Sequence, residues 1–260
     1  MGLVKGGYML ITNRCTTVVY NIQMYQVNRY LKHLLHSEKD PFKVPWGIKD
    51  FIFVVLLYNL VMLPLDSLFK DTNYQIIFGS LIMALVTVAI LRYRFKINAG
   101  LLGIKDDDIG VILRGIPLGL ILAAISMILS PNLHKIVNSI MQIPKSAAFL
   151  GIFVLLRKTI FLLLVVPFCE ELMFRGFIYA ALRKKLNILY STFLCSLLFA
   201  MLHGYTIMMD MLAVFIVSIF LTLSYERNQN IFVPVIAHSV YNFISYYSSF
   251  IVAYAAKHPS

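Results

Sequence analysis

Apolar runs separated by short polar segments occupy most of the chain after residue 48. A bilayer core requires ~20 consecutive apolar residues, and most of the runs come close to that length. The pattern therefore predicts an all-α protein, a polytopic transmembrane helix bundle of about seven to eight spans enclosing a buried polar cavity. The predicted spans cover residues 50–69, 74–91, 109–129, 159–182, 190–205, 207–225 and 231–256.

The segments outside these spans divide the chain. The N-terminal residues are mixed in polarity, which predicts a cytoplasmic or interfacial segment with an amphipathic helix near 16–35. Residues 130–147 predict an external loop, and the stretch that ends at Lys158 predicts an interfacial helix. We accordingly expect three regions: an N-terminal segment (1–47), N-terminal membrane helices (48–158) and a C-terminal catalytic membrane region (159–256).

Composition supports placement in a membrane. Hydrophobic residues make up 60% of the chain and charged residues 13%, against roughly 45–50% and about 25% in soluble domains. The net charge of +11 comes largely from basic residues at the ends of apolar runs, such as Arg92, Arg94 and Arg183, as the positive-inside rule describes. We therefore expect a multi-pass integral protein of a bacterial or archaeal cell membrane, with lipids rather than nucleic acid as partners.

One predicted span carries an unusual group of charges. In "PFCEELMFR", residues 167–175, Glu170, Glu171 and Arg175 lie inside an apolar run. An ionisable side chain at the bilayer midplane costs at least ~2.5–3.5 kcal/mol, so the three must face the bundle interior or a water-filled cavity. Glu171 and Arg175 are four residues apart and share a helix face, which predicts an ion pair. Glu170 lies ~100° around the helix without a local partner, which suits a general base.

Two further apolar helices each offer polar side chains. "FAMLHG", residues 199–204, places His203 one turn after Phe199, and "AHSVYN", residues 237–242, places His238 and Asn242 on one face. These groups together can take a proton from water and bind an oxyanion. Taken singly, each has a plain structural explanation, either a buried ion pair or a hydrogen bond between helices.

The segments "EELMFR", "FAMLH" and "HSVYN" resemble the EExxxR, FxxxH and HxxxN/B motifs of the CPBP family, which comprises type II CAAX prenyl endopeptidases and Abi-type proteins. The resemblance covers about 160–245, in the family's order. It implies an intramembrane endopeptidase whose cavity opens toward the cytoplasmic side. It further implies that Glu170 and His203 activate water, that His238 and Asn242 hold the oxyanion, and that Glu171 and Arg175 support them.

Cofactor use stays open at this level. Two histidines and a glutamate can ligate catalytic zinc, but the compact HExxH spacing is absent. A glutamate mechanism that requires no cofactor is therefore favoured, with zinc as the alternative. The three cysteines are odd in number and lack the paired spacing of a disulfide framework or a thiolate zinc site.

The expected substrate is a membrane-associated peptide precursor or a lipidated protein of the prenylated CAAX type. The first alternative function is a non-catalytic membrane scaffold or a bacteriocin self-immunity protein of the same family. The second is a proton-coupled transporter, because intramembrane Glu and His also form proton relays; no inverted repeat in the sequence supports it. Neither the substrate's identity nor the oligomeric state follows from the sequence.

Overall fold

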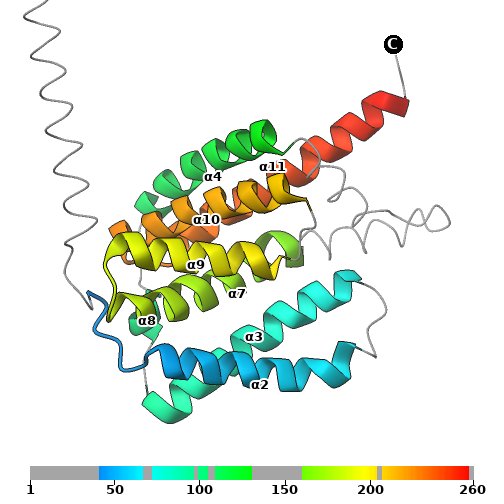
Figure 1. Cartoon of the computed structure of the whole chain (residues 1–260). Coiled ribbons are helices and arrows are strands. Elements are labelled where there is room, and N and C mark those ends of the chain that lie inside the picture. The colour runs from blue at the N-terminus through cyan, green and yellow to red at the C-terminus, as the bar shows by residue number, and fades with distance from the viewer. Residues whose placement is uncertain are drawn as a thin grey trace, which may run out of the picture.

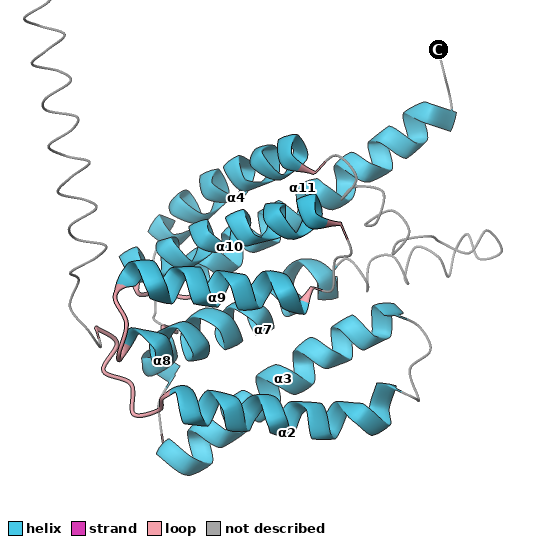
Figure 2. Cartoon of the chain, viewed as in Figure 1, coloured by secondary structure: helices cyan, strands magenta, loops and turns pink. Residues whose placement is uncertain are grey.

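The computed structural model describes residues 41–66, 72–96, 99–104, 109–130, 160–203 and 207–257. Throughout these ranges the regular structure is helical, with no strand (Figure 2). The helices are α2 (Ile48–Asp66), α3 (Thr72–Phe95), the 3₁₀ turn η1 (Ala99–Leu102), α4 (Ile109–Leu129), the π-helical η2 (Phe161–Val165), α7 (Val166–Glu171), the π-helical η3 (Leu172–Tyr179), α8 (Ala180–Arg183), α9 (Ile188–Leu202), α10 (Met208–Asn228) and α11 (Phe232–Lys257).

The predicted all-α bundle is confirmed. Each predicted span corresponds to a helix, and the run predicted at 109–129 coincides with α4. Among the described residues, three helices are long and apolar enough to cross a membrane, namely Phe78–Phe95 of α3, α4 and α10. The amphipathic helix expected near 16–35, the loop expected at 130–147 and the interfacial helix expected before Lys158 lie outside the described residues.

The elements η2, α7, η3 and α8 follow one another without a break and form one helix, which we call the central helix (residues 160–183). Every residue from Glu171 to Arg183 is buried. Helices α3, α9, α10 and α11 all contact it, and α4 packs on the far side of α10 and α11 (Figure 1). Its second half is therefore shielded from both water and lipid.

The residues that lead into α2 also reach the core, although they belong to the segment predicted as cytoplasmic or interfacial. Trp46 is fully buried and donates its indole N–H to the backbone oxygen of Phe177 at 3.1 Å. Phe42 stacks on Tyr225 with ring centroids 5.2 Å apart. These contacts attach the residues before α2 to the central helix and to α10.

Arg183 does not lie in an exposed basic loop. The run Arg183–Lys185 was expected to mark a cytoplasmic helix end, yet the Arg183 side chain is buried. Its guanidinium donates to both carboxylate oxygens of Glu226 on α10 and to the backbone oxygen of Leu186. Tyr179 donates its hydroxyl to the same carboxylate at 2.9 Å. This cluster joins the central helix to α10, and the loop charge comes from the two lysines.

The two glycines of α4 permit close packing against α11, as their small-xxx-small spacing predicts. A Cβ added at Gly115 would lie 2.7 Å from Ile236, and one added at Gly119 would lie 2.6 Å from both the backbone oxygen of Ala237 and Cβ of Val240. Ala237 immediately precedes His238. The packing of α4 therefore sets where α11 places that histidine.

We expect Gly119→Ala to lower the free energy of unfolding by about 1–3 kcal/mol, because the added methyl group must displace the backbone of α11. Gly47→Ala is the matched control, since a Cβ there meets nothing within 4 Å, and it should change stability by less than about 0.5 kcal/mol. Unfolding of the purified variants in mixed micelles measures both values. Equal stabilities for the two variants would contradict the close α4–α11 contact.

Candidate active site

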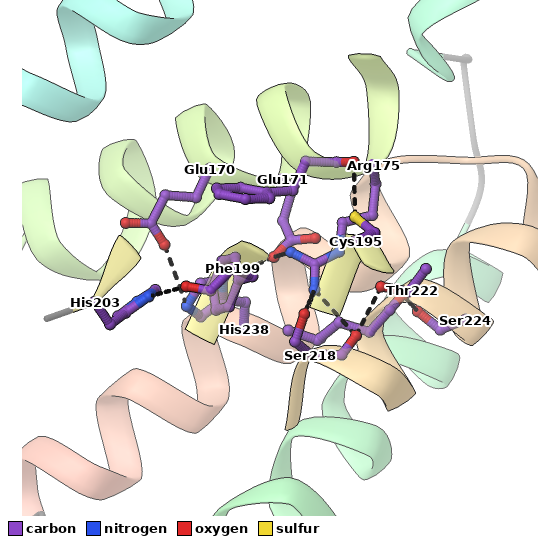
Figure 3. A network of polar contacts seen from close by, with 12 residues as sticks. Glu170, Glu171, Arg175, Cys195, Phe199, His203, Ser218, Thr222, Ser224 and His238 are labelled. Atoms are coloured by element: carbon purple, nitrogen blue, oxygen red, sulfur yellow. Dashed lines mark hydrogen bonds and ion pairs between the residues drawn. The ribbon is translucent and has the colours of Figure 1, made fainter. Parts of the chain in front are cut away.

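Five of the candidate residues come from three helices and lie close together in Figure 3, namely Glu170, Glu171, Arg175, His203 and His238. Glu170 and Glu171 end α7, Arg175 lies in η3, and His238 and Asn242 are on α11. His203 is the C-terminal cap of α9. The two glutamates thus lie between two π-helical segments, and such segments occur frequently at functional sites.

Glu171 and Arg175 form the ion pair predicted from their spacing. Nη1 of Arg175 donates to Oε1 of Glu171 at 3.0 Å, and both side chains are completely buried. Nη2 of Arg175 donates to the backbone oxygen of Ser218 on α10 at 3.1 Å and to its hydroxyl oxygen at 2.9 Å. The guanidinium is therefore held between the central helix and α10, and it supplies a positive charge to Glu171.

His238 lies between the two glutamates. Its Nδ1 is 2.8 Å from Oε1 of Glu171, and its Nε2 is 3.8 Å from Oε2 of Glu170. A carboxylate only accepts hydrogen bonds, so Nδ1 carries a hydrogen and donates it to Glu171. That bond orients the ring so that Nε2 faces Glu170.

The separation between Nε2 and Glu170 is longer than a hydrogen bond. A small polar group beside the two atoms could contact both of them. The Glu170 side chain keeps 18% of its surface exposed, whereas Glu171 keeps none. Of the two acids, Glu170 is the one that a water molecule or a substrate can approach.

Phe199 packs against three of the candidate residues. Its ring centroid lies 4.8 Å from Cζ of Arg175, 4.4 Å from the ring centroid of His203 and 6.0 Å from that of His238. Its backbone oxygen is 2.7 Å from Nδ1 of His203. The aromatic ring thus separates the buried ion pair from His203 and fixes how the two histidines lie relative to each other.

Asn242 lies one helical turn after His238 on α11 and makes a contact of its own. Its Nδ2 donates to the backbone oxygen of Leu162 in η2, at 3.3 Å. The amide nitrogen carries two hydrogens, so this bond uses half of its donor capacity. The structure therefore brings together Glu170, Glu171, Arg175 and His238, with His203 beside Phe199 and Asn242 one helical turn along α11.

The residues needed for the zinc alternative do not form a ligand set. Within the described part of the chain, no group of three or more His, Cys, Asp or Glu side chains is arranged to hold a metal ion. Nδ1 of His238 is bonded to Glu171 and Nδ1 of His203 to a backbone oxygen, which leaves each ring one nitrogen for any other contact.

Sequence reasoning missed Ser218, the residue that anchors the guanidinium. It is a fully buried serine in an apolar helix, and its separation of 43 residues from Arg175 gives no local pattern that joins them. The role of Phe199 was indicated only by its position one turn before His203. Contacts of this kind depend on how helices pack and leave no periodic signal.

Comparison with known proteins identifies the region that carries the motifs. The family described as "Type II CAAX prenyl endopeptidase Rce1-like" matches residues 148–244. No curated protein and no solved structure matches the chain. The matched region contains Glu170, Glu171, Arg175, His203, His238 and Asn242. This match and the apolar helices indicate an integral membrane protein, and residues 148–244 are similar to the Rce1-like type II CAAX prenyl endopeptidases.

Proposed function

We propose that this protein is an intramembrane endopeptidase that hydrolyses a peptide bond of a membrane-associated peptide or lipidated protein. The supporting observation is that the two adjacent acids differ in ion pairing and in exposure. Glu171 is neutralised by Arg175 and bonded to His238, whereas Glu170 is partly exposed and faces His238 across 3.8 Å. A buried site with one neutralised acid and one accessible acid provides a base where water can reach it.

In the proposed reaction, Glu170, assisted by His203, takes a proton from a water molecule, and the water oxygen bonds to the carbonyl carbon of the substrate. The carbonyl oxygen becomes an oxyanion that accepts hydrogen bonds from His238 and Asn242. The carbon–nitrogen bond then breaks, and the proton held by Glu170 passes to the leaving amine.

The buried ion pair would prepare His238 for this role. With hydrogens on both nitrogens, His238 donates from Nδ1 to Glu171 and offers Nε2–H to the oxyanion. The carboxylate of Glu171, held in place by Arg175 and Ser218, fixes the orientation of this ring through its bond to Nδ1.

The function is tested by mass spectrometry of peptides from cells with the wild-type protein and cells with Glu170→Ala. We expect a defined set of cleavage products in wild-type cells and their loss in the variant, at equal protein levels in the membrane. Lys185→Ala, an exposed position away from the site, is the control and should keep the products. Identical product sets with and without Glu170 would refute the proposal.

We further propose that the reaction uses no metal, because the described His, Cys, Asp and Glu side chains form no metal-holding group. Cleavage by the purified protein should keep its rate after treatment with a strong chelator. Elemental analysis of the same active sample should find much less than one zinc per chain. One zinc per chain, with a rate that falls on chelation and returns on adding zinc, would contradict a metal-free mechanism.

A further inference from the structure

Two side chains from other parts of the molecule bind the backbone of η3, the π-helical segment that follows the two glutamates. Trp46, before α2, donates its indole N–H to the backbone oxygen of Phe177 at 3.1 Å. The thiol of Cys195 on α9 donates to the backbone oxygen of Phe174 at 3.3 Å (Figure 3). Both donors are fully buried. The two carbonyl groups lie on either side of Arg175 in the chain, so the backbone that carries the guanidinium is fixed by bonds from outside its own helix.

The π-helical geometry of η3 makes these outside bonds important. A π-helix is rare in proteins and occurs mostly as single turns, whereas η3 runs for eight residues. The α-helix is the common alternative for the same stretch of chain, so contacts that fit the π geometry must favour it here. The bonds from Trp46 and Cys195 are such contacts, because a change of helical geometry would move the accepting oxygens away from their donors.

The site depends on this geometry because its buried ion pair crosses the boundary between α7 and η3. Glu171 is the last residue of α7, and Arg175 lies within η3. A π turn closes on the fifth residue and an α turn on the fourth. A return to α geometry would therefore rotate one side of the boundary against the other, by ~100° for each residue of shift. Arg175 would then turn relative to Glu171, the acceptor that orients His238.

Trp46 is itself fixed in its place against η3. Its ring centroid lies 5.8 Å from that of Phe177 and 6.4 Å from that of Phe95 on α3. The indole has a single N–H, and the bond to the backbone oxygen of Phe177 uses it. Another part of η3 is also closely packed, because a Cβ added at Gly176 would lie 3.1 Å from the backbone oxygen of Leu102. The segment therefore has little room to change its geometry while these contacts persist.

We infer that Trp46 and Cys195 are positioning residues for the candidate site. They keep η3 in its π-helical geometry, and through Arg175 and Glu171 they set the orientation of His238. The inference rests on the proposed peptidase function for the reaction that this orientation serves. Trp46 lies outside residues 148–244, the region that the family matches. The inference thus gives the N-terminal part of the chain a role in the site.

The NMR signal of the His238 ring tests the inference without relying on activity. The full-length protein is labelled with isotope-enriched histidine and purified in micelles, and His238→Gln identifies the signal by its loss. Nδ1 of His238 donates to Glu171, which is paired with Arg175. The resonance of this N–H therefore reports whether the ring and the ion pair keep their arrangement.

Two variants remove the outside donors, and each has a matched control. Trp46→Phe removes the indole N–H and keeps an aromatic ring, whereas Phe95→Leu weakens the packing around Trp46 without removing a bond to η3. Cys195→Ala removes the thiol, whereas Cys195→Ser keeps a hydrogen-bond donor at the same position. Cys195→Ala deletes a single heavy atom, so it keeps the inference testable if Trp46→Phe fails to fold.

We expect the His238 signal to shift by more than its line width in Trp46→Phe and Cys195→Ala, and to keep its wild-type position in both controls. With an identified substrate, the two donor variants should also lose kcat about 10–10²-fold while KM stays within about twofold, because a small misplacement of reacting groups lowers kcat. The controls should keep the wild-type kcat.

An unchanged His238 signal in both donor variants would overturn the inference, and so would an equal shift in Phe95→Leu, since packing alone would then explain it. If the signals shift as expected but the wild-type protein cleaves no peptide, the positioning stands and the proposed hydrolysis fails. If the wild-type protein cleaves a peptide and both donor variants cleave it at the same rate, the hydrolysis stands and the positioning fails.

Discussion

Arg175→Met should lower the free energy of unfolding by about 3–5 kcal/mol, because it leaves the carboxylate of Glu171 buried without its counter-charge. The Glu171 side chain has no exposed surface, and its Oε2 has no hydrogen-bond partner among the residues that the structure describes. Methionine retains much of the volume and flexibility of the arginine side chain. The loss of stability therefore comes mainly from removing the positive charge of Arg175. Reversible unfolding of the purified protein in mixed micelles measures it.

A double-mutant cycle separates the ion pair from packing. Glu171→Gln removes the charge that Arg175→Met leaves uncompensated, and removing both partners of a buried pair is often close to neutral. We therefore expect the double variant to be more stable than Arg175→Met alone, and its loss to be smaller than the sum of the two single losses. Additive losses would mean that the two side chains do not stabilise each other.

Glu170→Gln should reduce kcat about 10²–10⁴-fold while leaving the stability of the protein unchanged within about 0.5 kcal/mol. Glutamine preserves the size and most hydrogen bonds of the side chain but cannot take a proton from water. The position is partly exposed, and the carboxylate of Glu170 approaches Nε2 of His238 only to 3.8 Å, which is longer than a hydrogen bond. Steady-state cleavage of an identified substrate, together with unfolding, measures both effects.

Glu171→Gln is the matched control, because it makes the same chemical change one residue further along. This variant should lose stability, since Arg175 is then buried without a counter-charge. We thus expect different effects of the same change at the two adjacent glutamates. Glu170→Gln should lose activity and keep its stability, whereas Glu171→Gln should lose stability. If Glu170→Gln cleaves at the wild-type rate, Glu170 is not the base. If both variants lose stability equally, the assignment of roles is wrong.

Helix positions and local pairs could be predicted from the sequence, because both depend on short-range periodicity. The apolar run at 109–129 coincides with α4 because its length matches what a bilayer requires. The pairing of Glu171 with Arg175 follows from the helical period, which places residues four apart on one face. The close approach of α4 and α11 follows from the absence of side chains at Gly115 and Gly119.

The remaining features depend on packing between helices that are distant in sequence. The bond from His238 to Glu171 spans 67 residues, and the contact of Arg175 with Ser218 spans 43. A basic run suggested that Arg183 lies in a loop, but its side chain is buried and pairs with Glu226, 43 residues away. No local pattern encodes which side chains meet when helices pack.

By itself, the sequence determined that this chain is a helical membrane bundle with acids and histidines on three helices, because apolar run length and helical period are local properties. Only the tertiary structure decided which residue of α10 anchors Arg175, and which nitrogen of His238 faces Glu170. These are relations between separate helices, and the free energy that sets them comes from packing, buried charge and hydrogen bonds across the bundle.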